Sequence, residues 1–350
     1  MNGAQATDPA RPAGVPLPDL TGPLGRPPRV LVTGAGGPSG VCFLRALAGS
    51  CDLWAGDIDP NAAGLYLVDR ERRWLLPRGD ADGFARTLLD LCERLRVDVL
   101  VPTVDTELVP LARSASRFAE AGVRTLVSDA AALERCLDKW TLAETCRETV
   151  SVPHTVLLEE GAADRFGAGF PAVAKPRRGS GSRGIVMAAE PDALTGLPHD
   201  GSYLLQELLP GTEYSVDVLM GPDGGARAAV PRARDKTDSG IIVAGHILDR
   251  PGLSRFAADV ASALGLRGIC NVQVREDRGG RPALLEVNPR PPGGMSLTVA
   301  AGVQMPAWAV AGLLGADVPG HIAHHPLSAV RHWEDVVMGP DALGDVAGRA

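Results

Sequence analysis

A regular alternation of short apolar runs and longer amphipathic stretches extends from residue 29 to residue 128. The apolar runs, which are typical of strands, lie at 29–32, 52–56, 98–102 and 123–127. Stretches with helical periodicity lie between them, at 41–48, 84–95 and 105–118. Because parallel strands need crossover connections, this alternation predicts an α/β domain whose parallel sheet carries helices on both faces. Residues 1–28, rich in Pro, Gly and Ala, are expected to form a flexible tail.

The composition argues against several classes of protein. The chain has 350 residues, a net charge of −7 and no basic run, which argues against a nucleic-acid-binding protein. Its apolar stretches fall short of the ~18 residues that span a bilayer, and the N-terminus lacks the pattern of a secretory signal. The six cysteines have no metal-binding or disulfide spacing. We therefore expect a cytoplasmic protein with reduced thiols, no membrane segment and no nucleic-acid partner.

Lysine is rare in this chain. The 35 basic residues include three lysines, Lys139, Lys175 and Lys236, and the others are arginine. An ammonium group is a compact point charge, whereas a guanidinium is a planar fork, so the two are not interchangeable at a binding site. Chance is one explanation for the presence of these three lysines, and a functional need for ammonium groups is the other. The three lysines are therefore candidate functional residues.

The stretch from Leu284 to Gly294 joins a predicted strand to a Pro-Pro-Gly-Gly turn. Side chains alternate along a strand, so Glu286 and Asn288 should share one face, with Arg290 just beyond them. A carboxylate and an amide oxygen beside a guanidinium suit Mg²⁺ with a phosphate next to it. An ordinary surface ion pair at a strand end is the alternative interpretation.

A second predicted strand, 269–275, precedes this one across a short turn. With a four-residue turn, Asn271 would oppose Glu286. Gln273 would then oppose Leu284, and the amide and carboxylate side chains would share a face. Polar groups gathered on one buried face are costly unless they bind something. This pairing favours a binding site over a surface ion pair.

A glycine-rich loop follows the predicted strand that ends at Lys175. The loop has the sequence Arg-Arg-Gly-Ser-Gly-Ser-Arg-Gly and contains Gly179, Ser180, Gly181, Ser182 and Gly184. The accessible backbone N–H groups, hydroxyls and guanidinium groups of such a loop can surround polyphosphate. It differs from a Walker A loop, because the sequence contains no Gly-Lys pair. A basic hairpin tip is the alternative.

Other predicted elements surround these motifs. A long helix is expected over 129–148, with Lys139 in its middle. Two predicted strands, 203–207 and 213–219, flank an apolar connector. The polar stretch 234–240 is expected to be a mobile loop.

A glycine-rich turn at 34–40 offers a different interpretation of the first domain. Its spacing, with Asp57 after the next strand, would suit a dinucleotide. Pro38, however, removes one N–H donor from the helix that follows. Asp105 and Glu107 follow another strand, where α/β sheets bind ligands, but both would also compensate a helix dipole. The sequence leaves the roles of these carboxylates open.

Together these motifs resemble the ATP-grasp superfamily, and the chain looks closest to the branch around the carbamoyl-phosphate synthase large subunit. The most specific motifs are Asn271-Val-Gln273, Glu286-Val-Asn-Pro-Arg290 and Gln206-Glu-Leu-Leu-Pro-Gly-Thr-Glu213. The resemblance implies an α/β plus α+β fold, in which a Rossmann-like pre-ATP-grasp domain precedes an ATP-grasp fold of two subdomains. The implied boundaries are 29–128 for the first domain, 129–200 for the small subdomain and 201–345 for the large subdomain.

The resemblance also implies which residues would bind ATP. Lys139 and Lys175 would contact the phosphates, and the loop from Gly179 to Gly184 would close over them. The residues expected to face adenine are Glu207, Leu208 and Leu209. Glu213 would accept hydrogen bonds from the ribose.

Metal and catalytic residues are implied in the same way. The expected Mg²⁺ ligands, with Mn²⁺ as an alternative ion, are Glu286, Asn288 and Gln273. Arg290 would stabilise the transferring phosphate. Lys236 would lie near the phosphates or the acceptor. Arg290 and Lys236 are both expected to be catalytic.

The implied activity is that of an ATP-dependent ligase. It would join a small-molecule carboxylate to an amine, with amino acids as the expected substrates, through an acyl phosphate, releasing ADP and phosphate. The chain has one ATP-grasp unit, and it lacks both a glutaminase-like segment and the motif by which biotin carboxylases activate bicarbonate, so carbamoyl-phosphate formation is not expected. Family members are often dimers, which makes a homodimer a candidate assembly.

Three alternatives to this activity stay open at this point. They are an NAD(P)-dependent oxidoreductase that uses the turn at 34–40, a non-catalytic ATP-binding protein, and a ligase that uses bicarbonate. The sequence also leaves open whether Arg232 and Arg234 contact the substrate.

Overall fold

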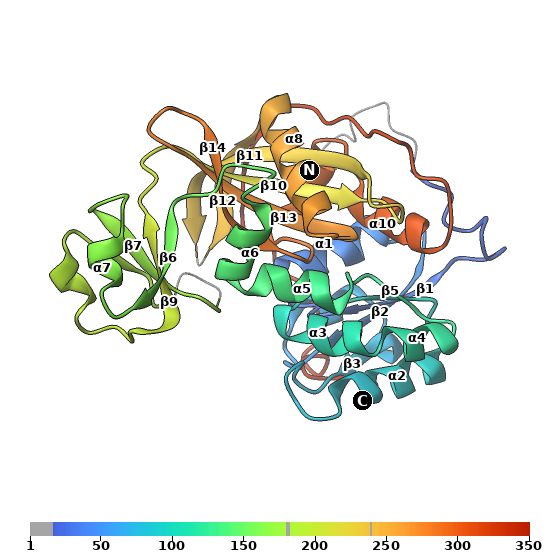
Figure 1. Cartoon of the computed structure of the whole chain (residues 1–350). Helices are drawn as coiled ribbons and strands as arrows, with labels where there is room; N and C mark the ends of the chain where they lie inside the picture. The colour runs from blue at the N-terminus through green and yellow to red at the C-terminus, as the bar shows by residue number, and fades with distance from the viewer. Residues whose placement is uncertain (1–16, 180–182, 239) are drawn as a thin grey trace, which may run out of the picture.

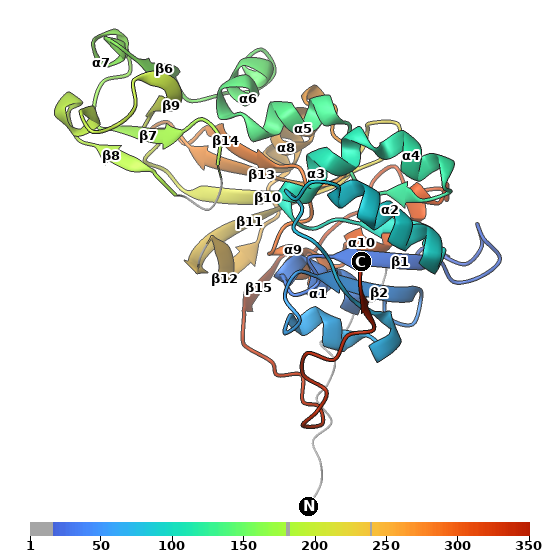
Figure 2. The same ribbon diagram turned by 90° about the horizontal axis from the view of Figure 1, so that it is seen from below.

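The computed structural model describes residues 17–179, 183–238 and 240–350. These residues form a first domain on a parallel sheet, a large antiparallel sheet and a smaller antiparallel sheet (Figure 1). The two views place the smaller sheet at one end of the molecule, away from the first domain (Figures 1 and 2). The ATP-grasp-like combination of α/β and α+β parts expected from the sequence is confirmed.

The first domain is built on parallel strands in the order β16-β3-β2-β1-β4-β5. Its strands are β1 (Arg29–Thr33), β2 (Asp52–Asp57), β3 (Arg73–Leu75), β4 (Val99–Val101), β5 (Arg124–Thr125) and β16 (Gly348–Arg349). The helices are α1 (Pro38–Leu47), α2 (Phe84–Leu95), α3 (Asp105–Arg113) and α4 (Ala115–Glu120). The alternation of apolar and amphipathic segments therefore predicted this domain correctly. β16 was not foreseen, and it returns the end of the chain to this first sheet.

The prediction of a flexible tail is wrong for the described residues 17–28. Leu20 is 3% exposed, and Leu17 and Leu24 pack against the same buried cluster. Residues 1–16 lie outside the described part of the chain. Because leucine side chains lose water contact when they pack, the described residues from 17 onward belong to the folded domain.

The large sheet is antiparallel, with the strand order β14-β13-β10-β11-β12-β15. Its strands are β10 (Glu213–Met220), β11 (Ala226–Asp238), β12 (Ile241–Ile247), β13 (Gly268–Glu276), β14 (Pro282–Asn288) and β15 (Leu327–Val330). Helices α8 (Pro251–Ala263), α9 (Met295–Ala300) and α10 (Met305–Leu313) follow in the same half of the chain. The prediction of a mobile loop at 234–240 was wrong for residues 234–238, because β11 continues there and pairs with β12.

The smaller sheet has the order β6-β9-β7-β8 and its own buried core. Its elements are β6 (Thr155–Glu159), α7 (Ala162–Arg165), β7 (Ala172–Pro176), β8 (Val186–Ala188) and β9 (Asp200–Glu207). The expected boundary at residue 200 is therefore too early, since β9 belongs to this sheet as far as Glu207.

The predicted long helix over 129–148 is two helices, α5 (Ala130–Leu137) and α6 (Lys139–Cys146). Asp138 lies between them, and its carboxylate accepts hydrogen bonds from the backbone N–H groups of Trp140 and Thr141. An N-cap of this kind starts a new helix. Lys139 is consequently the first residue of α6, rather than a residue in the middle of a longer helix. Both helices pack with the large sheet. The expected boundaries had placed them in the small subdomain, and the structure differs from that expectation.

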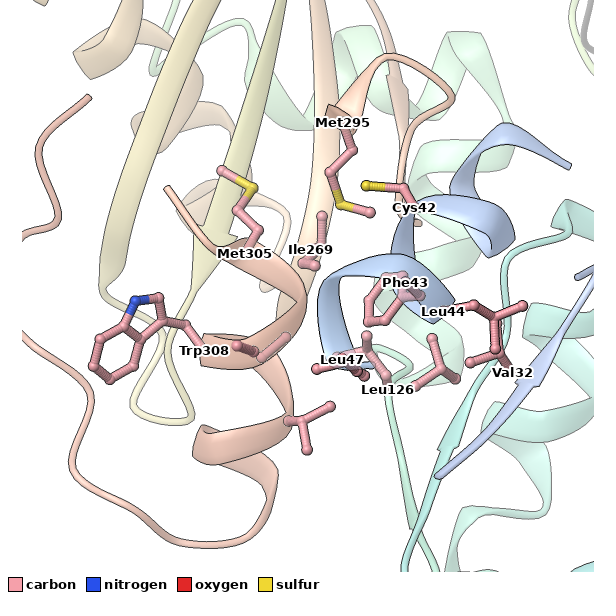
Figure 3. Close-up of a cluster of buried hydrophobic side chains, with 14 of the residues drawn as sticks. Val32, Cys42, Phe43, Leu44, Leu47, Leu126, Ile269, Met295, Met305 and Trp308 are labelled. Atoms are coloured by element: carbon pink, nitrogen blue, oxygen red, sulfur yellow. The ribbon is translucent and has the colours of Figure 1, made fainter. Parts of the chain in front are cut away.

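The first domain and the large sheet share one hydrophobic core (Figure 3). Phe43 and Leu47 of α1 lie beside α10, and Met295 lies beside Cys42 of α1 (Figure 3). Burying a large apolar side chain contributes about 1.5–3 kcal/mol. This contiguous core holds the carboxyl ends of the first domain's strands in a fixed position against the large sheet.

Candidate active site

A cavity of about 1240 Å³ lies where the first domain, the smaller sheet and the large sheet meet. Single small ligands usually occupy about 300–1,000 Å³, so this cavity has room for a nucleotide and a second molecule. Its walls include the strand ends of the first domain, β7, the connector after β9, and β10, β11, β13 and β14.

The hairpin of β13 and β14 supplies the polar cluster that the sequence predicted. Asn271, Gln273, Glu286 and Asn288 all line the cavity, so the expected sharing of one face is confirmed. The expected register was wrong: Asn271 pairs with Asn288, and Gln273 pairs with Glu286. The turn is one residue longer than expected, since Glu276 pairs with Pro282, and an irregularity between Gln273 and Val274 adds a second residue of shift. The two shifts together keep the same side chains on the same face.

Glu286 and Asn288 present oxygen ligands in a suitable place for a hard cation. Asn288 Nδ2 donates to Glu286 Oε1 at 3.3 Å, and Gln273 lies opposite Glu286 on the neighbouring strand. Among the described residues, no group of three or more His, Cys, Asp or Glu side chains converges in a way that could hold a metal. One carboxylate and amide oxygens fit Mg²⁺, which completes its shell with water and phosphate.

Two of the three lysines face this cluster from different elements. Lys175, at the end of β7, is 7% exposed, and burial lowers the pKa of its ammonium to about 8, with the nearby Glu286 carboxylate opposing that shift. Burial also lowers the pKa of Lys139, which Glu286 likewise opposes. Lys139 and Lys175 both line the cavity. Two ammonium groups around one carboxylate leave net positive charge, which suits a polyphosphate.

The glycine-rich loop is anchored to α6 by a buried carboxylate. Asp138 is 1% exposed and accepts hydrogen bonds from Arg177 Nε at 2.8 Å and Arg178 Nη2 at 3.1 Å. Lys139 Nζ donates to the backbone oxygen of Gly179 at 2.7 Å. These contacts bring Lys139 to the base of the loop. Sequence reasoning missed the Asp138 contacts, because both arginines lie about 40 residues further along the chain.

The described ends of that loop need glycine. Gly179 has φ +138° and Gly184 has φ +72°, a region that L side chains rarely adopt. A Cβ atom at Gly184 would also lie 2.9 Å from the Tyr203 hydroxyl. The predicted loop residues Ser180, Gly181 and Ser182 lie outside the described residues.

The last residue of β9, Glu207, and the connector residues Leu208 and Leu209 line the cavity, as does Glu213 at the start of β10. The Glu207 carboxylate accepts from the His154 backbone N–H at 3.3 Å. Glu213 Oε1 accepts from Arg234 Nη1 at 2.8 Å. These residues line one cavity, and their contacts with a nucleotide base and ribose stay predictions.

The two predicted catalytic residues have different positions. Arg290 lines the cavity, and its guanidinium forms a bidentate ion pair with Asp105. Lys236 is exposed on β11 and is absent from the described lining, which includes its neighbours Arg234 and Thr237. Register irregularities lie on both sides of Lys236, which accounts for its departure from strict alternation. A catalytic role for Lys236 stays a prediction, since the structure places this residue outside the described cavity lining.

A buried network behind the Pro-Pro-Gly-Gly turn was not foreseen. Arg232, which is 2% exposed, pairs with Asp217, with 2.5 Å between Arg232 Nη1 and Asp217 Oδ2. Asn271 Nδ2 and Thr298 Oγ1 also donate to the Asp217 carboxylate, at 2.8 and 2.7 Å. A Cβ atom at Gly294 would lie 2.9 Å from Arg232 Cζ, so glycine lets the turn rest on the guanidinium. The available sequence signal was the alternation along β10, which puts Asp217 on one face with Ser215; in the structure Asp217 pairs with Asn271 of β13.

The glycine-rich turn at 34–40 is explained by packing. Gly36 N donates to Asp57 Oδ2 at 2.9 Å, and Asp59 N donates to Asp57 Oδ1 at 3.0 Å. A Cβ atom at Gly36 would lie 2.6 Å from Ala62 Cβ, and one at Gly40 would lie 2.5 Å from the Gly34 backbone oxygen. Asp57 therefore orders the turn itself, rather than being held free for a ribose.

Comparisons with known proteins agree with this geometry. Residues 199–336 match the family described as ATP-grasp in the biosynthetic pathway with Ter operon, and residues 31–126 match the PylC-like N-terminal domain. A D-alanine–D-alanine ligase of Gloeobacter violaceus is 34% identical over 152 residues, covering 37% of this chain and 48% of that enzyme. The matched part thus spans about half the length of this curated relative, and less of the others.

Solved structures share the fold at low sequence identity. The biotin carboxylase of Campylobacter jejuni, determined as a β,γ-ATP complex, superposes with a TM-score of 0.68 at 16% identity, covering 83% of this chain and 72% of that one. The L-amino acid ligase of Bacillus licheniformis gives a TM-score of 0.61 at 15% identity, covering 82% and 74%.

Family matches to two separate parts of the chain, together with the shared fold, support the resemblance to ATP-grasp proteins. The part that carries Glu286 and Arg290 matches the Ter-operon-associated ATP-grasp family, and the first domain is similar to the PylC-like N-terminal domain. The nearer resemblance to the carbamoyl-phosphate synthase branch stays a prediction. No helix among the described residues is long and apolar enough to cross a membrane.

Proposed function

We propose that this protein is an ATP-dependent carboxylate–amine ligase that forms an amide bond through an acyl phosphate. The observation that carries the proposal is the meeting of Lys139, Lys175 and the Glu286–Asn288 pair in one cavity that continues to the first domain. The family matches and the ligase names of several relatives support it.

ATP would lie between the smaller and the large sheet. Its phosphates would face Lys139 and Lys175, and its base would face the connector after β9. Glu286 and Asn288, with Gln273 beside them, would hold Mg²⁺ or Mn²⁺. When bound, the ion neutralises phosphate charge, which is the main requirement of phosphoryl transfer.

The proposed reaction has two steps. A carboxylate oxygen of the acid attacks the γ-phosphorus, the bond from that phosphorus to the β,γ-bridging oxygen breaks, and ADP leaves. The amine nitrogen of the second substrate then attacks the acyl carbon, the carbon–oxygen bond to phosphate breaks, and the nitrogen loses a proton. Arg290 would stabilise the charge on the transferring phosphate.

The substrates are proposed to occupy the first-domain end of the cavity. Glu107 lines this end, is 5% exposed and accepts a hydrogen bond from Thr33 Oγ1 at 2.5 Å. Burial raises the pKa of Glu107 to about 7. A carboxyl group with such a pKa can take the proton that an attacking amine loses. We therefore favour amino acids or similar small amines, as the names of the relatives also suggest.

Glu107→Gln is expected to slow the amine-dependent step. Glutamine keeps the volume and can still accept from Thr33, but it cannot take a proton at neutral pH. We expect kcat to fall about 10²-fold while the KM for ATP changes less than about twofold. Steady-state ADP release at varied amine concentration measures this. An unchanged kcat would remove Glu107 from the proposed chemistry.

ATP binding is expected to weaken as the pH rises through about 8. The pKa of Lys175 is lowered from its ordinary value to about 8, so the ammonium that attracts phosphate loses its proton above that pH. Bound phosphate favours the charged form, and the loss approaches tenfold in affinity per pH unit. Calorimetric titration with MgATP between about pH 6.5 and 9.5 measures it. Lys175→Arg should flatten the profile, because a guanidinium stays charged.

A product screen tests the proposed function directly. The protein is incubated with ATP, Mg²⁺ and pairs of amino acids, and ADP, phosphate and product mass are recorded. Amide formation with one ADP per product supports the proposal. Release of AMP and pyrophosphate would contradict an acyl-phosphate mechanism, and ATP binding without turnover on any pair would favour a non-catalytic ATP-binding protein.

A further inference from the structure

The ion pair between Arg290 and Asp105 joins two domains at the wall of the cavity. Arg290 Nε donates to Asp105 Oδ1 at 2.6 Å, and Arg290 Nη2 donates to Asp105 Oδ2 at 2.9 Å. Arg290 follows β14 of the large sheet, whereas Asp105 is the first residue of α3 in the first domain. Both side chains line the cavity. Two parallel hydrogen bonds fix both the position and the plane of a guanidinium.

Asp105 is not used as a helix cap. The N-cap position of α3 is Val104, and no side-chain cap hydrogen bond is formed there. Each Asp105 oxygen instead accepts one N–H of Arg290. The residues on either side are held through their side chains by buried hydrogen bonds, from Thr103 Oγ1 to the Thr33 backbone oxygen and from Thr33 Oγ1 to Glu107 Oε2. Asp105 is therefore a carboxylate on a fixed support, directed toward the large sheet.

Contacts with other described residues leave some donors of the guanidinium for a ligand. It has five N–H donors, of which two bond to Asp105 and one, on Nη1, bonds to the Pro291 backbone oxygen at 3.3 Å. The first domain also holds the next residue, because Ser39 Oγ donates to the Pro291 backbone oxygen at 2.9 Å. The two remaining donors belong to a guanidinium that lines the cavity, as Glu286 and Asn288 do on the same strand end.

Without Asp105, Arg290 would have a competing partner. Glu286 lies four residues before Arg290. The Glu286 carboxylate forms no ion pair within salt-bridge distance with another described residue. A freed arginine side chain is long and flexible, so it would sample positions near the Glu286 carboxylate, where the metal is proposed to bind.

We propose that Asp105 is a positioning residue for phosphoryl transfer, a role that rests on the proposed function. It holds the Arg290 guanidinium toward the transferring phosphate and away from Glu286. The first domain thereby takes part in the chemistry of the ATP site as well as in substrate binding.

The test compares binding of MgADP with and without aluminium fluoride, which imitates a phosphoryl group in transfer. Wild type should bind MgADP more tightly when aluminium fluoride is present. This increase in MgADP affinity is called the aluminium fluoride gain below. In Asp105→Asn we expect MgADP affinity within about twofold of wild type and loss of about tenfold in the aluminium fluoride gain. Asp105→Glu should restore part of that gain. The kcat for the best substrate pair should fall about 10- to 100-fold in Asp105→Asn.

A double-mutant cycle separates positioning from a structural role. If Asp105 acts through Arg290, the Asp105→Asn/Arg290→Ala variant should lose no more of the gain than Arg290→Ala does. Asp98→Asn is the matched control, because Asp98 also forms a bidentate pair, with Arg26, and does not belong to the described cavity lining. It should keep the full aluminium fluoride gain.

Three results would overturn the positioning role. They are an unchanged aluminium fluoride gain in Asp105→Asn, a further loss in the Arg290→Ala background, and an equal loss in Asp98→Asn. Absence of ADP release with every substrate pair in wild type would count against the proposed ligase activity instead, and the aluminium fluoride comparison would still decide the role of Asp105.

Discussion

Replacing Glu286 by alanine is expected to abolish ATP turnover. Glu286 is the carboxylate of the Mg²⁺ ligand set proposed here, and its charge also acts on Lys139 and Lys175. Without it, the cation loses its charged protein ligand and the triphosphate loses the charge neutralisation that phosphoryl transfer requires. We expect ADP release to fall by about 10³-fold or more. Turnover at increasing Mg²⁺ concentration is the measurement.

Glu286→Gln sharpens this experiment because it keeps the shape of the side chain. Removing the negative charge beside two ammonium groups should leave metal-free ATP binding intact or stronger, while the response to Mg²⁺ is lost. Glu276→Gln is the control, since Glu276 lies on the neighbouring β13, pairs with Arg250 and is absent from the described cavity lining. Turnover that survives in Glu286→Ala at ordinary Mg²⁺ concentrations would exclude Glu286 as the metal ligand.

The sequence predicted features whose cause is local or periodic. Apolar runs separated by amphipathic helices determined the parallel first domain, because each strand has to bury both faces. The hairpin of β13 and β14 was predicted from side-chain alternation, and its polar face survived a register error of two residues. Parity, rather than the exact pairing, decides which face a side chain occupies. The scarcity of lysine identified Lys139 and Lys175 before any motif was considered.

Features that depend on partners far away in the chain were missed. The break at Asp138 depends on Arg177 and Arg178, which neutralise a buried carboxylate that a continuous helix would leave without partners. Residues 234–238 look like a polar loop, but β12 satisfies their backbone groups and makes them a strand. The pairing of Asp105 with Arg290 joins residues 185 positions apart, and nothing in either local sequence indicates it.

The structure changes the significance of the three lysines. Their rarity in the sequence made all three equal candidates, but two of them line the cavity while the third is exposed on β11. An exposed lysine has little effect on the free energy of folding, whereas burying an ammonium is unfavourable without a compensating interaction. The burial of Lys175, and not its rarity, is therefore the stronger argument that it serves a ligand.

Lys175→Met is expected to have opposite effects on ATP affinity and on stability. Methionine has a similar length without the charge, so affinity for MgATP should fall by about 2–4 kcal/mol, which is roughly 30- to 1,000-fold. The folded protein should become more stable at neutral pH, because burial lowers the pKa of Lys175 and the ammonium is unfavourable there without a ligand. A group whose folded pKa is lowered destabilises most below that pKa. The stability gain should therefore shrink as the pH rises from about 8 toward the ordinary lysine value.

Lys236→Met is the matched control, since it makes the same substitution at an exposed position outside the described cavity lining. It should leave ATP affinity within about twofold of wild type and melting temperature unchanged within about 2 °C. Calorimetric titration gives the affinities, and thermal unfolding at several pH values gives the stabilities. A Lys175→Met protein that is less stable and still binds ATP would show that Lys175 is structural. Loss of turnover in Lys236→Met would instead show that β11 moves during the reaction and brings Lys236 to the acceptor.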